Sequence, residues 1–234
     1  INGQVVTWNG QENQVVNGLY AVGECSCVSV HGANRLGTNS LLDLLVFGKS
    51  AGKHIVHYVN GYGDHQPMPG DGSDRTLARL NQLQDSKDGT YAQDVANDIR
   101  ASMQQHAGVF RTQKGMDEGV VKINAIRDRV ASVTLKDKSK VWNTARMEAL
   151  EVDNLIEVAQ ATMTSAAARK ECRGAHTVYD YEHPADHPEC PLGRNDKEWM
   201  KHTLWHSANN NLTYKPVNLK PLTVDSIPPK VRTF

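Results

Sequence analysis

The chain has 234 residues, enough for one large domain or two small ones. Its 26 lysine and arginine residues equal its 26 aspartate and glutamate residues, which argues against a nucleic-acid or anionic-membrane binder built on bulk positive charge. The apolar runs are also far shorter than the roughly 20 residues that a membrane-spanning helix needs, and Asp43 interrupts the longest of them.

The first 24 residues have the pattern of β-strands. Short apolar runs at 5–8, 15–16 and 19–22 are separated by a polar turn around Asn9 and Gly10. The last run ends in Gly23-Glu24, which we interpret as a carboxylate at the carboxyl end of a parallel strand, where doubly wound sheets bind ligands. Because the sequence starts at Ile1 inside this strand pattern, without methionine, we expect a piece of a longer chain.

The stretch SVHGANRLGTNSLLD, residues 29–43, predicts an anion site. Asn39 or Ser40 can cap a helix that continues through residue 59, and the first turn of a helix attracts negative charge. Arg35 adds a planar guanidinium that suits a carboxylate, while Gly32 and Gly37 allow close approach of the backbone to a ligand. A strand end, an acid, a glycine-flanked arginine and a helix N-terminus together indicate an anion and cofactor site.

The rest of the chain is mainly helical in pattern. Residues 60–74 are rich in glycine, proline and aspartate and predict a linker. Apolar residues then recur every three or four positions over 76–110 (interrupted near 88–89), 120–133 and 142–163. These stripes predict an antiparallel three-helix bundle of the spectrin-repeat kind. After residue 171 prolines break the chain into short strands or extended arms that need another surface to dock on.

The predicted fold class is therefore α+β and mainly helical. We expect three parts: a partial α/β segment with the anion and cofactor site at 1–59, the helical bundle at 60–170, and a small α+β docking region at 171–234. The cofactor of the first part is implied by the resemblance described next.

The stretch GLYAVGECSCVSVHGANRLGTNSLLDLLVFGKSAG resembles the flavoprotein subunit of succinate dehydrogenase and fumarate reductase almost residue for residue, and most closely that of succinate dehydrogenase. The resemblance continues through RKECRGAHTVYDY to the terminal PPKVRTF and so covers essentially the whole chain. It implies oxidation of succinate to fumarate with covalent FAD, and electron transfer to an iron–sulfur subunit and quinone. Glu24, Ser40 and Leu41 match residues that contact FAD, and Arg35 matches the arginine that holds a substrate carboxylate.

The resemblance also indicates what this chain lacks. No G-x-G-x-x-G motif occurs, and the family's pyrophosphate-binding unit, flavin-attaching histidine and proton-transferring arginine belong to segments that precede Ile1. We therefore expect no catalytic residue in this chain and no appreciable FAD binding by the chain alone. Two positions depart from the family pattern: Val178 stands where a second arginine is frequent, and Phe234 where tyrosine is common.

The resemblance also bears on partners and location. It implies membrane anchor subunits beside the iron–sulfur subunit, the substrates succinate and fumarate, a flavinylation assembly factor as a further partner, and no nucleic acid. The location implied is peripheral, on the cytoplasmic face of a bacterial inner membrane or the matrix side in mitochondria. Three alternatives stay open: a fumarate reductase flavoprotein, an L-aspartate oxidase, which shares similar loops, and a non-catalytic helical interaction module.

Several histidines and cysteines invite other interpretations. Five residues near the C-terminus offer metal donors, but prolines prevent the helix that would align the first two, so we expect no native metal site; they are His183, His187, Cys190, His202 and His206. We interpret His31 as a packed, hydrogen-bonded histidine rather than a catalytic base. We interpret Cys25 and Cys27 as buried thiols rather than redox-active groups, and the spacing of all four cysteines favours a reducing compartment.

Overall fold

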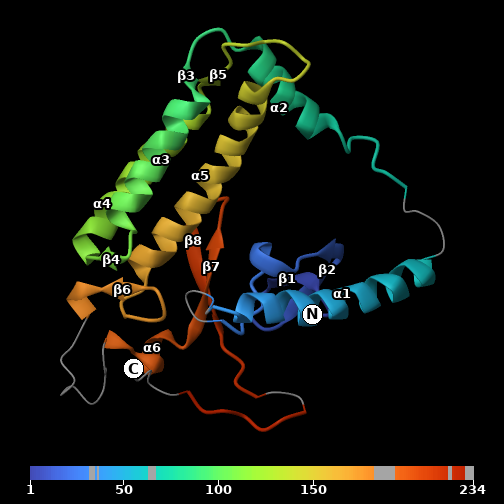
Figure 1. The fold of residues 1–234 in the computed structure, drawn as a ribbon, viewed down its shortest axis with the longest axis vertical. Helices are drawn as coiled ribbons and strands as arrows, with labels where there is room; N and C mark the ends of the chain where they lie inside the picture. Colours follow the sequence, from blue (N-terminus) through green and yellow to red (C-terminus); the bar gives the residue numbers. More distant parts are fainter. Residues whose placement is uncertain (32–34, 36, 63–66, 182–192, 221–222, 230–234) are drawn as a thin grey trace. The chain divides into compact units, whose positions relative to one another are not determined.

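The computed structural model describes residues 1–31, 35, 37–62, 67–181, 193–220 and 223–229 (Figure 1). The chain forms two compact units, 1–68 and 69–234, which are treated separately below. The three-part division expected from the sequence stays a prediction. Within the described helices, none is both long and apolar enough to cross a membrane.

Unit 1 begins with a β-hairpin. Strand β1 (Gln4–Trp8) pairs antiparallel with β2 (Asn13–Tyr20). The turn between them is closed by the Asn9 side chain, whose Oδ1 accepts the backbone N–H groups of Gln11 and Glu12 at 2.9 Å. The prediction of a parallel strand before Glu24 is therefore wrong: the turn folds the two apolar runs directly onto each other, and β2 ends at Tyr20.

A long helix completes unit 1. Helix α1 (Asn39–Tyr62) begins at Asn39 itself, one or two residues before the start that a cap at Asn39 or Ser40 predicted, and extends three residues beyond the predicted end at residue 59. The hairpin is attached to this helix by Tyr20, whose hydroxyl lies 2.8 Å from Nδ1 of His54 and whose ring meets that of Tyr58 edge to face. Between the hairpin and α1, a single 3-10 turn, η1 (Gly23–Cys25), redirects the chain.

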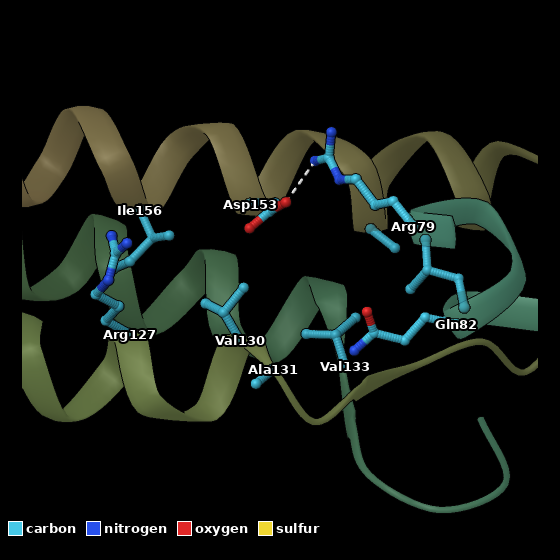
Figure 2. Close-up of a pocket in the computed structure, with 10 residues that line it drawn as sticks. Arg79, Gln82, Arg127, Val130, Ala131, Val133, Asp153 and Ile156 are labelled. Carbon is cyan, nitrogen blue, oxygen red and sulfur yellow. Dashed lines mark ion pairs between the residues drawn. The ribbon is translucent and has the colours of Figure 1, made fainter. Parts of the chain in front are cut away.

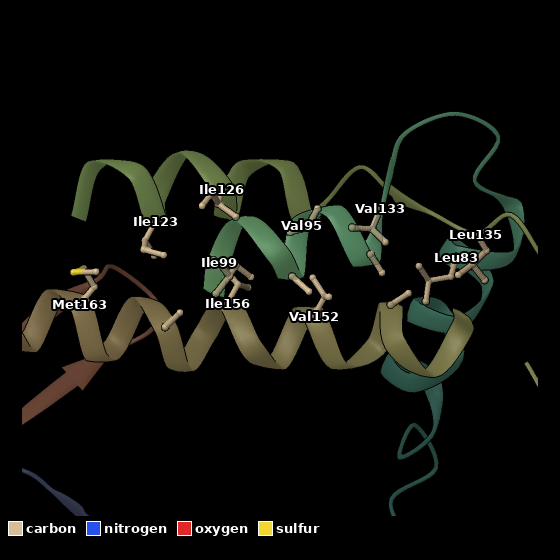
Figure 3. Packing of buried hydrophobic residues seen from close by; sticks show 14 residues of the cluster. Leu83, Val95, Ile99, Ile123, Ile126, Val133, Leu135, Val152, Ile156 and Met163 are labelled. Carbon is tan, nitrogen blue, oxygen red and sulfur yellow. The ribbon is translucent and has the colours of Figure 1, made fainter. Parts of the chain in front are cut away.

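Unit 2 is built on four helices: α2 (Asp74–Asp85), α3 (Ala92–His106), α4 (Gln113–Val130) and α5 (Thr144–Ala168). The periodic stripes predicted these helices, including the interruption near residue 88. Figure 3 shows their shared core, in which Ile99, Ile123 and Ile156 are almost fully buried. Leu83 of α2 enters the same core, so four helices contribute to it, and the spectrin-like three-helix bundle stays a prediction.

Short parallel strand pairs mark the two ends of α3 and α4. Strand β3 (Thr90–Tyr91), before α3, pairs with β5 (Val133–Thr134), after α4. Strand β4 (Phe110–Arg111), between these helices, pairs with β6 (Thr177–Val178). Val133 therefore belongs to a strand rather than to the helical stripe in which the sequence placed it. Figure 1 shows how the two pairs bracket the bundle.

The C-terminal region packs against α5 within unit 2. It comprises η2 (Tyr179–Tyr181), the short helix α6 (Asp196–Trp199), and an antiparallel hairpin of β7 (Lys201–His206) and β8 (Asn211–Pro216). Short strands or extended arms were expected in this region, and the structure forms strands at 201–206 and 211–216. Val178 packs with Met116, Ala166 and Ala167 in a second apolar cluster, which accounts for an apolar residue at this position.

Ion pairs fasten this region to the end of α5. The carboxylate of Glu171 is fully buried and accepts from Arg169 at 2.7 Å, from Arg173 at 2.7 and 3.0 Å, and from the backbone N–H of Asn195 at 2.9 Å. Arg169 also donates to the carbonyl oxygens of Trp199 and Lys201 at 3.0 and 2.8 Å. Glu171 thus links the end of α5 to the segment that leads into α6.

His176 beside this network is held in its neutral form. Its Nδ1 lies 2.9 Å from Arg111 Nη1, which can only donate, so Nδ1 accepts and Nε2 carries the proton that it donates to the Arg169 carbonyl at 3.1 Å. Burial lowers the pKa of His176 below its ordinary value, and the charges of Arg111 and Arg169 lower it further, while the hydrogen bond to the Arg169 carbonyl and the charge of Glu171 oppose the shift.

This lowered pKa predicts acid sensitivity of unit 2. Between pH 7 and 5 an unfolded histidine, with a pKa of about 6.5, takes up a proton that folded His176 resists, so the free energy of unfolding should decrease as the pH falls. We expect His176→Gln to make the free energy of unfolding depend less steeply on pH, by an amount that corresponds to at most one bound proton. Urea unfolding at several pH values measures this slope. His202, whose pKa burial also lowers, leaves a residual slope of the same sign. An unchanged slope in His176→Gln would contradict this assignment.

Candidate functional site

Arg35 lies between the turn after the hairpin and the start of α1. Its Nη2 donates to the carbonyl oxygen of Gly23 at 2.6 Å and, more weakly, to that of Ser26 at 3.4 Å. Its Nη1 lies 3.2 Å from Oδ2 of Asp43, and 17% of the side chain is exposed. The guanidinium is thus held in one orientation by a carboxylate on one side and by backbone carbonyls on the other.

Asp43 is the buried carboxylate of this site. Its side chain is 1% exposed, and its Oδ2 also lies 2.9 Å from Nε2 of His31. His31 is hydrogen-bonded, as the sequence predicted. The sequence analysis missed the role of Asp43, although an acid inside an apolar helical run, one turn after a helix start, is a signal of a buried counter-ion. Asp43 links His31 and Arg35 to α1.

The start of α1 has the polarity that an anion requires. Its first turn contains no acidic residue, so the positive end of the helix dipole is not neutralised there. Ser40 is half-buried, and the side chain of Leu41 is exposed. The backbone N–H of Leu41 donates to the Thr38 carbonyl at 3.0 Å, and that of Leu42 donates to the same oxygen at 3.3 Å. In this arrangement the Leu41 amide is already satisfied within the chain.

Glu24 lies in the turn that receives Arg35. Its side chain is exposed, and it directly follows Gly23, whose carbonyl accepts from Arg35. Gly23 has a φ of +85°, and a Cβ there would come within 2.6 Å of Leu44 Cδ2. The Leu44 side chain can move aside, but a residue other than glycine would be strained at this φ, and the strain would fall on the turn whose carbonyl orients Arg35. The structure thus brings Gly23, Arg35 and Asp43 together and places Glu24 and Ser40 on the elements that carry them.

The other candidates named from the sequence lie elsewhere or differ from expectation. Cys25 and Cys27 are both exposed, so their interpretation as buried thiols is wrong: η1 and the segment after it turn these side chains outward. Of the possible metal donors, His202 and His206 lie on β7, whereas His183, His187 and Cys190 fall outside the described residues. Gly32 also falls outside them.

A cavity of about 330 Å³ lies in unit 2 between α2, α4 and α5 (Figure 2). Its floor is apolar, with Val133 and Ile156 among the lining residues. The arginines at its rim already have carboxylate partners: Arg79 lies 2.7 Å from Asp153, and Arg127 pairs with Glu157. Arg35 is likewise paired with a carboxylate, that of Asp43, so the pairing does not distinguish the two places. The start of α1, which has no acidic residue in its first turn, favours the Arg35 site for a small carboxylate.

Models of known protein families match parts of both units. A family model described as the fumarate reductase flavoprotein C-terminal region matches residues 96–234, and an FAD-binding domain model matches residues 1–41. The second match includes Glu24, Arg35, Ser40 and Leu41, the residues that the resemblance had related to cofactor and substrate contacts.

Individual relatives agree with these models. The chain is 43% identical to the succinate dehydrogenase flavoprotein subunit of Rickettsia bellii and 37% identical to the mitochondrial subunit of Oryza sativa, in each case over its whole length. It superimposes on Escherichia coli quinol fumarate reductase with a TM-score of 0.74 and 31% identity, over 93% of this chain and 36% of that one. The chain spans 38% and 36% of the two relatives' lengths.

Proposed function

Because the chain belongs to the family of succinate dehydrogenase and fumarate reductase flavoprotein subunits, we propose that it supplies the substrate clamp and part of the flavin site of a succinate-oxidising enzyme. The observation that carries this proposal is the geometry of Arg35. A guanidinium fixed by Asp43 and the Gly23 carbonyl, beside a helix N-terminus, is preorganised to hold one carboxylate of a dicarboxylate.

The residues present fit FAD as the cofactor. Glu24 offers an exposed carboxylate that can accept hydrogen bonds from ribose hydroxyls, and the start of α1 at Ser40 and Leu41 favours negative charge on an isoalloxazine edge. FAD, when bound, supplies the two-electron acceptor for the oxidation. The chain's own contribution is to bind and orient: Arg35 holds the substrate, and Asp43 and Gly23 hold Arg35. No proton-transferring residue is proposed in this chain.

The wider assembly follows from the same family. We propose an iron–sulfur subunit and membrane anchor subunits as partners of the full-length flavoprotein, a peripheral position at the membrane, and an antiparallel three-helix bundle within residues 60–170 as the scaffold of unit 2. Fumarate reduction is the reverse reaction and needs the same clamp, so the structure of the site is compatible with both directions. The fumarate reductase among the structural neighbours supports that compatibility.

Substrate choice tests the proposed function. The full-length flavoprotein that contains this chain should reduce an artificial electron acceptor with succinate and not with L-aspartate, because relatives that are 43% and 37% identical to the chain are succinate dehydrogenase flavoprotein subunits. Equal turnover of L-aspartate would favour an L-aspartate oxidase instead. Absence of turnover with either substrate, in a preparation that holds stoichiometric flavin, would favour a non-catalytic role.

Isolated as residues 1–234, the chain should retain little FAD. The groups assigned to the flavin offer a few hydrogen bonds of roughly 0.5–1.5 kcal/mol each, and these must offset several kcal/mol of lost ligand freedom. Equilibrium dialysis against micromolar FAD measures this directly. Stoichiometric retention of yellow flavin would show that these residues hold a larger share of the site than the contacts of Glu24, Ser40 and Leu41 account for.

A further inference from the structure

The loop between β5 and α5 presents a tryptophan to solvent. Trp142 is 97% exposed, and its neighbour Val141 is 72% exposed. Trp142 also has a φ of +53°, in the left-handed region that costs a bulky residue strain energy. A large apolar side chain held in an unfavourable backbone conformation, with almost no contact to its own chain, has no evident packing role.

Asn143 holds this loop from the α5 side. It is buried, and its Nδ2 donates to the carbonyl oxygens of Asp137 at 2.8 Å and Ser139 at 2.9 Å. Its Oδ1 accepts the backbone N–H of Arg146 at 2.9 Å and so caps α5. One side chain thus closes the loop and starts the helix directly after Trp142.

Further bonds attach the same loop to the end of α2. The ammonium group of Lys138 donates to the carbonyl oxygens of Leu83 at 2.8 Å and Ser86 at 2.7 Å, and Arg146 donates to Ser139 at 3.1 Å. The loop is therefore built and fixed on both sides. The fixed loop holds Trp142 in solvent. Because the conformational entropy of its backbone has already been lost on folding, binding a partner would not lose it again.

The surroundings of Trp142 are basic. Residues 136–140 read KDKSK, and Lys136 and Lys140 are exposed. The one acid, Asp137, accepts hydrogen bonds from both the backbone and the hydroxyl of Ser139, and these bonds lower its pKa below the ordinary value. A partner surface that covers Trp142 would therefore meet positive charge around an apolar centre.

We propose that Val141 and Trp142 form a docking finger for a separate polypeptide of the assembled enzyme, one that offers an apolar pocket edged by carboxylates. Tryptophan dominates the central contacts of protein interfaces, where a rigid aromatic anchor enters a pocket and polar residues form the rim. The finger (defined as Val141 and Trp142) fits that description, with Lys136 and Lys140 as rim charges. The identity of this partner rests on the proposed function, because it is a polypeptide of the assembled enzyme, whereas the exposure of Trp142 does not.

Oxidative labelling read by mass spectrometry tests the proposal at Trp142 itself. We compare the full-length flavoprotein subunit purified alone with the same subunit in the purified membrane complex. Trp142 should be labelled strongly in the isolated subunit and protected at least tenfold in the complex. Equal labelling in both would overturn the proposal, and so would protection already present in the isolated subunit. Protection that grows with concentration of the isolated subunit would indicate a second copy of this chain instead.

Three variants separate docking from folding. Trp142→Gly relieves the left-handed backbone, so its Tm should be unchanged or higher while the affinity of the subunit for its partner falls at least tenfold. Asn143→Asp keeps the acceptor that caps α5 but loses both donor bonds, so affinity should fall with Trp142 still present. The matched control is Val158→Ala, another exposed apolar position, on α5. Loss of affinity in Val158→Ala alone, or wild-type affinity in Trp142→Gly, would contradict the proposal.

Discussion

Replacing Arg35 with lysine in the full-length flavoprotein is expected to lower kcat/KM for succinate by about 100-fold, with flavin content unchanged. Lysine keeps the positive charge but has one nitrogen in place of the two that contact Gly23 and Asp43, so it loses the planar geometry that would align a substrate carboxylate. Succinate would still be attracted, but it would not be aligned with the flavin that accepts its electrons. Steady-state kinetics with succinate and an artificial electron acceptor measure this effect.

The effect should be specific to position 35, because an arginine-to-lysine change elsewhere leaves the proposed clamp intact. Arg75 lies on α2 and is exposed, so Arg75→Lys should have wild-type kinetics and serves as the matched control. Wild-type kcat/KM in Arg35→Lys would show that Arg35 is not the clamp. Loss of flavin together with activity would place Arg35 in the support of the cofactor site instead.

The second large effect is expected at Glu171. Glu171→Ala removes the carboxylate partner of Arg169 from a buried network and leaves Arg173 with the partly exposed Asp196, and breaking a buried pair in this way costs about 3–5 kcal/mol. Glu171→Gln keeps the shape and an acceptor for the Asn195 N–H and should cost less. Urea unfolding followed by circular dichroism gives the free energy of unfolding of each variant.

A partly exposed carboxylate in the same network provides the comparison. Asp196 is 41% exposed and pairs with Arg173 and Arg194 at 2.6 Å. Solvent screens such pairs, so Asp196→Asn should cost less than about 1 kcal/mol. If Glu171→Ala cost no more than Asp196→Asn, the buried carboxylate would not be what fastens α6 and the hairpin to α5.

The helices could be predicted from the sequence because a single stripe of apolar residues reports on a single buried face. Spacing of three to four residues identified α3, α4 and α5, and the glycine at position 89 identified the break after α2. Strand pairing was harder to predict. The runs around Val6 and Val15 are compatible with parallel or antiparallel neighbours, and only the Asn9 turn, which joins them in space, decides between the two.

The site could be predicted only in part, for a similar reason. Arg35 and the start of α1 carry signals in their own residue types, an arginine among glycines and a capping pair. The role of Asp43 depends on which side chains meet it after folding, and His31 lies twelve residues before it in the chain. Glu171 likewise gains its role from Asn195, 24 residues away, which no local pattern reveals.

Titration of the full-length, flavin-loaded protein with malonate tests most directly whether Arg35 binds a dicarboxylate. Malonate carries two carboxylates but has no bond that the enzyme can oxidise, so a change in flavin absorbance reports binding alone. Loss of a charged, bidentate contact of about 1.5–3 kcal/mol predicts a Kd for malonate that rises by roughly 10- to 100-fold in Arg35→Ala. Equal malonate affinity in wild type and Arg35→Ala, with flavin retained in both, would contradict the clamp.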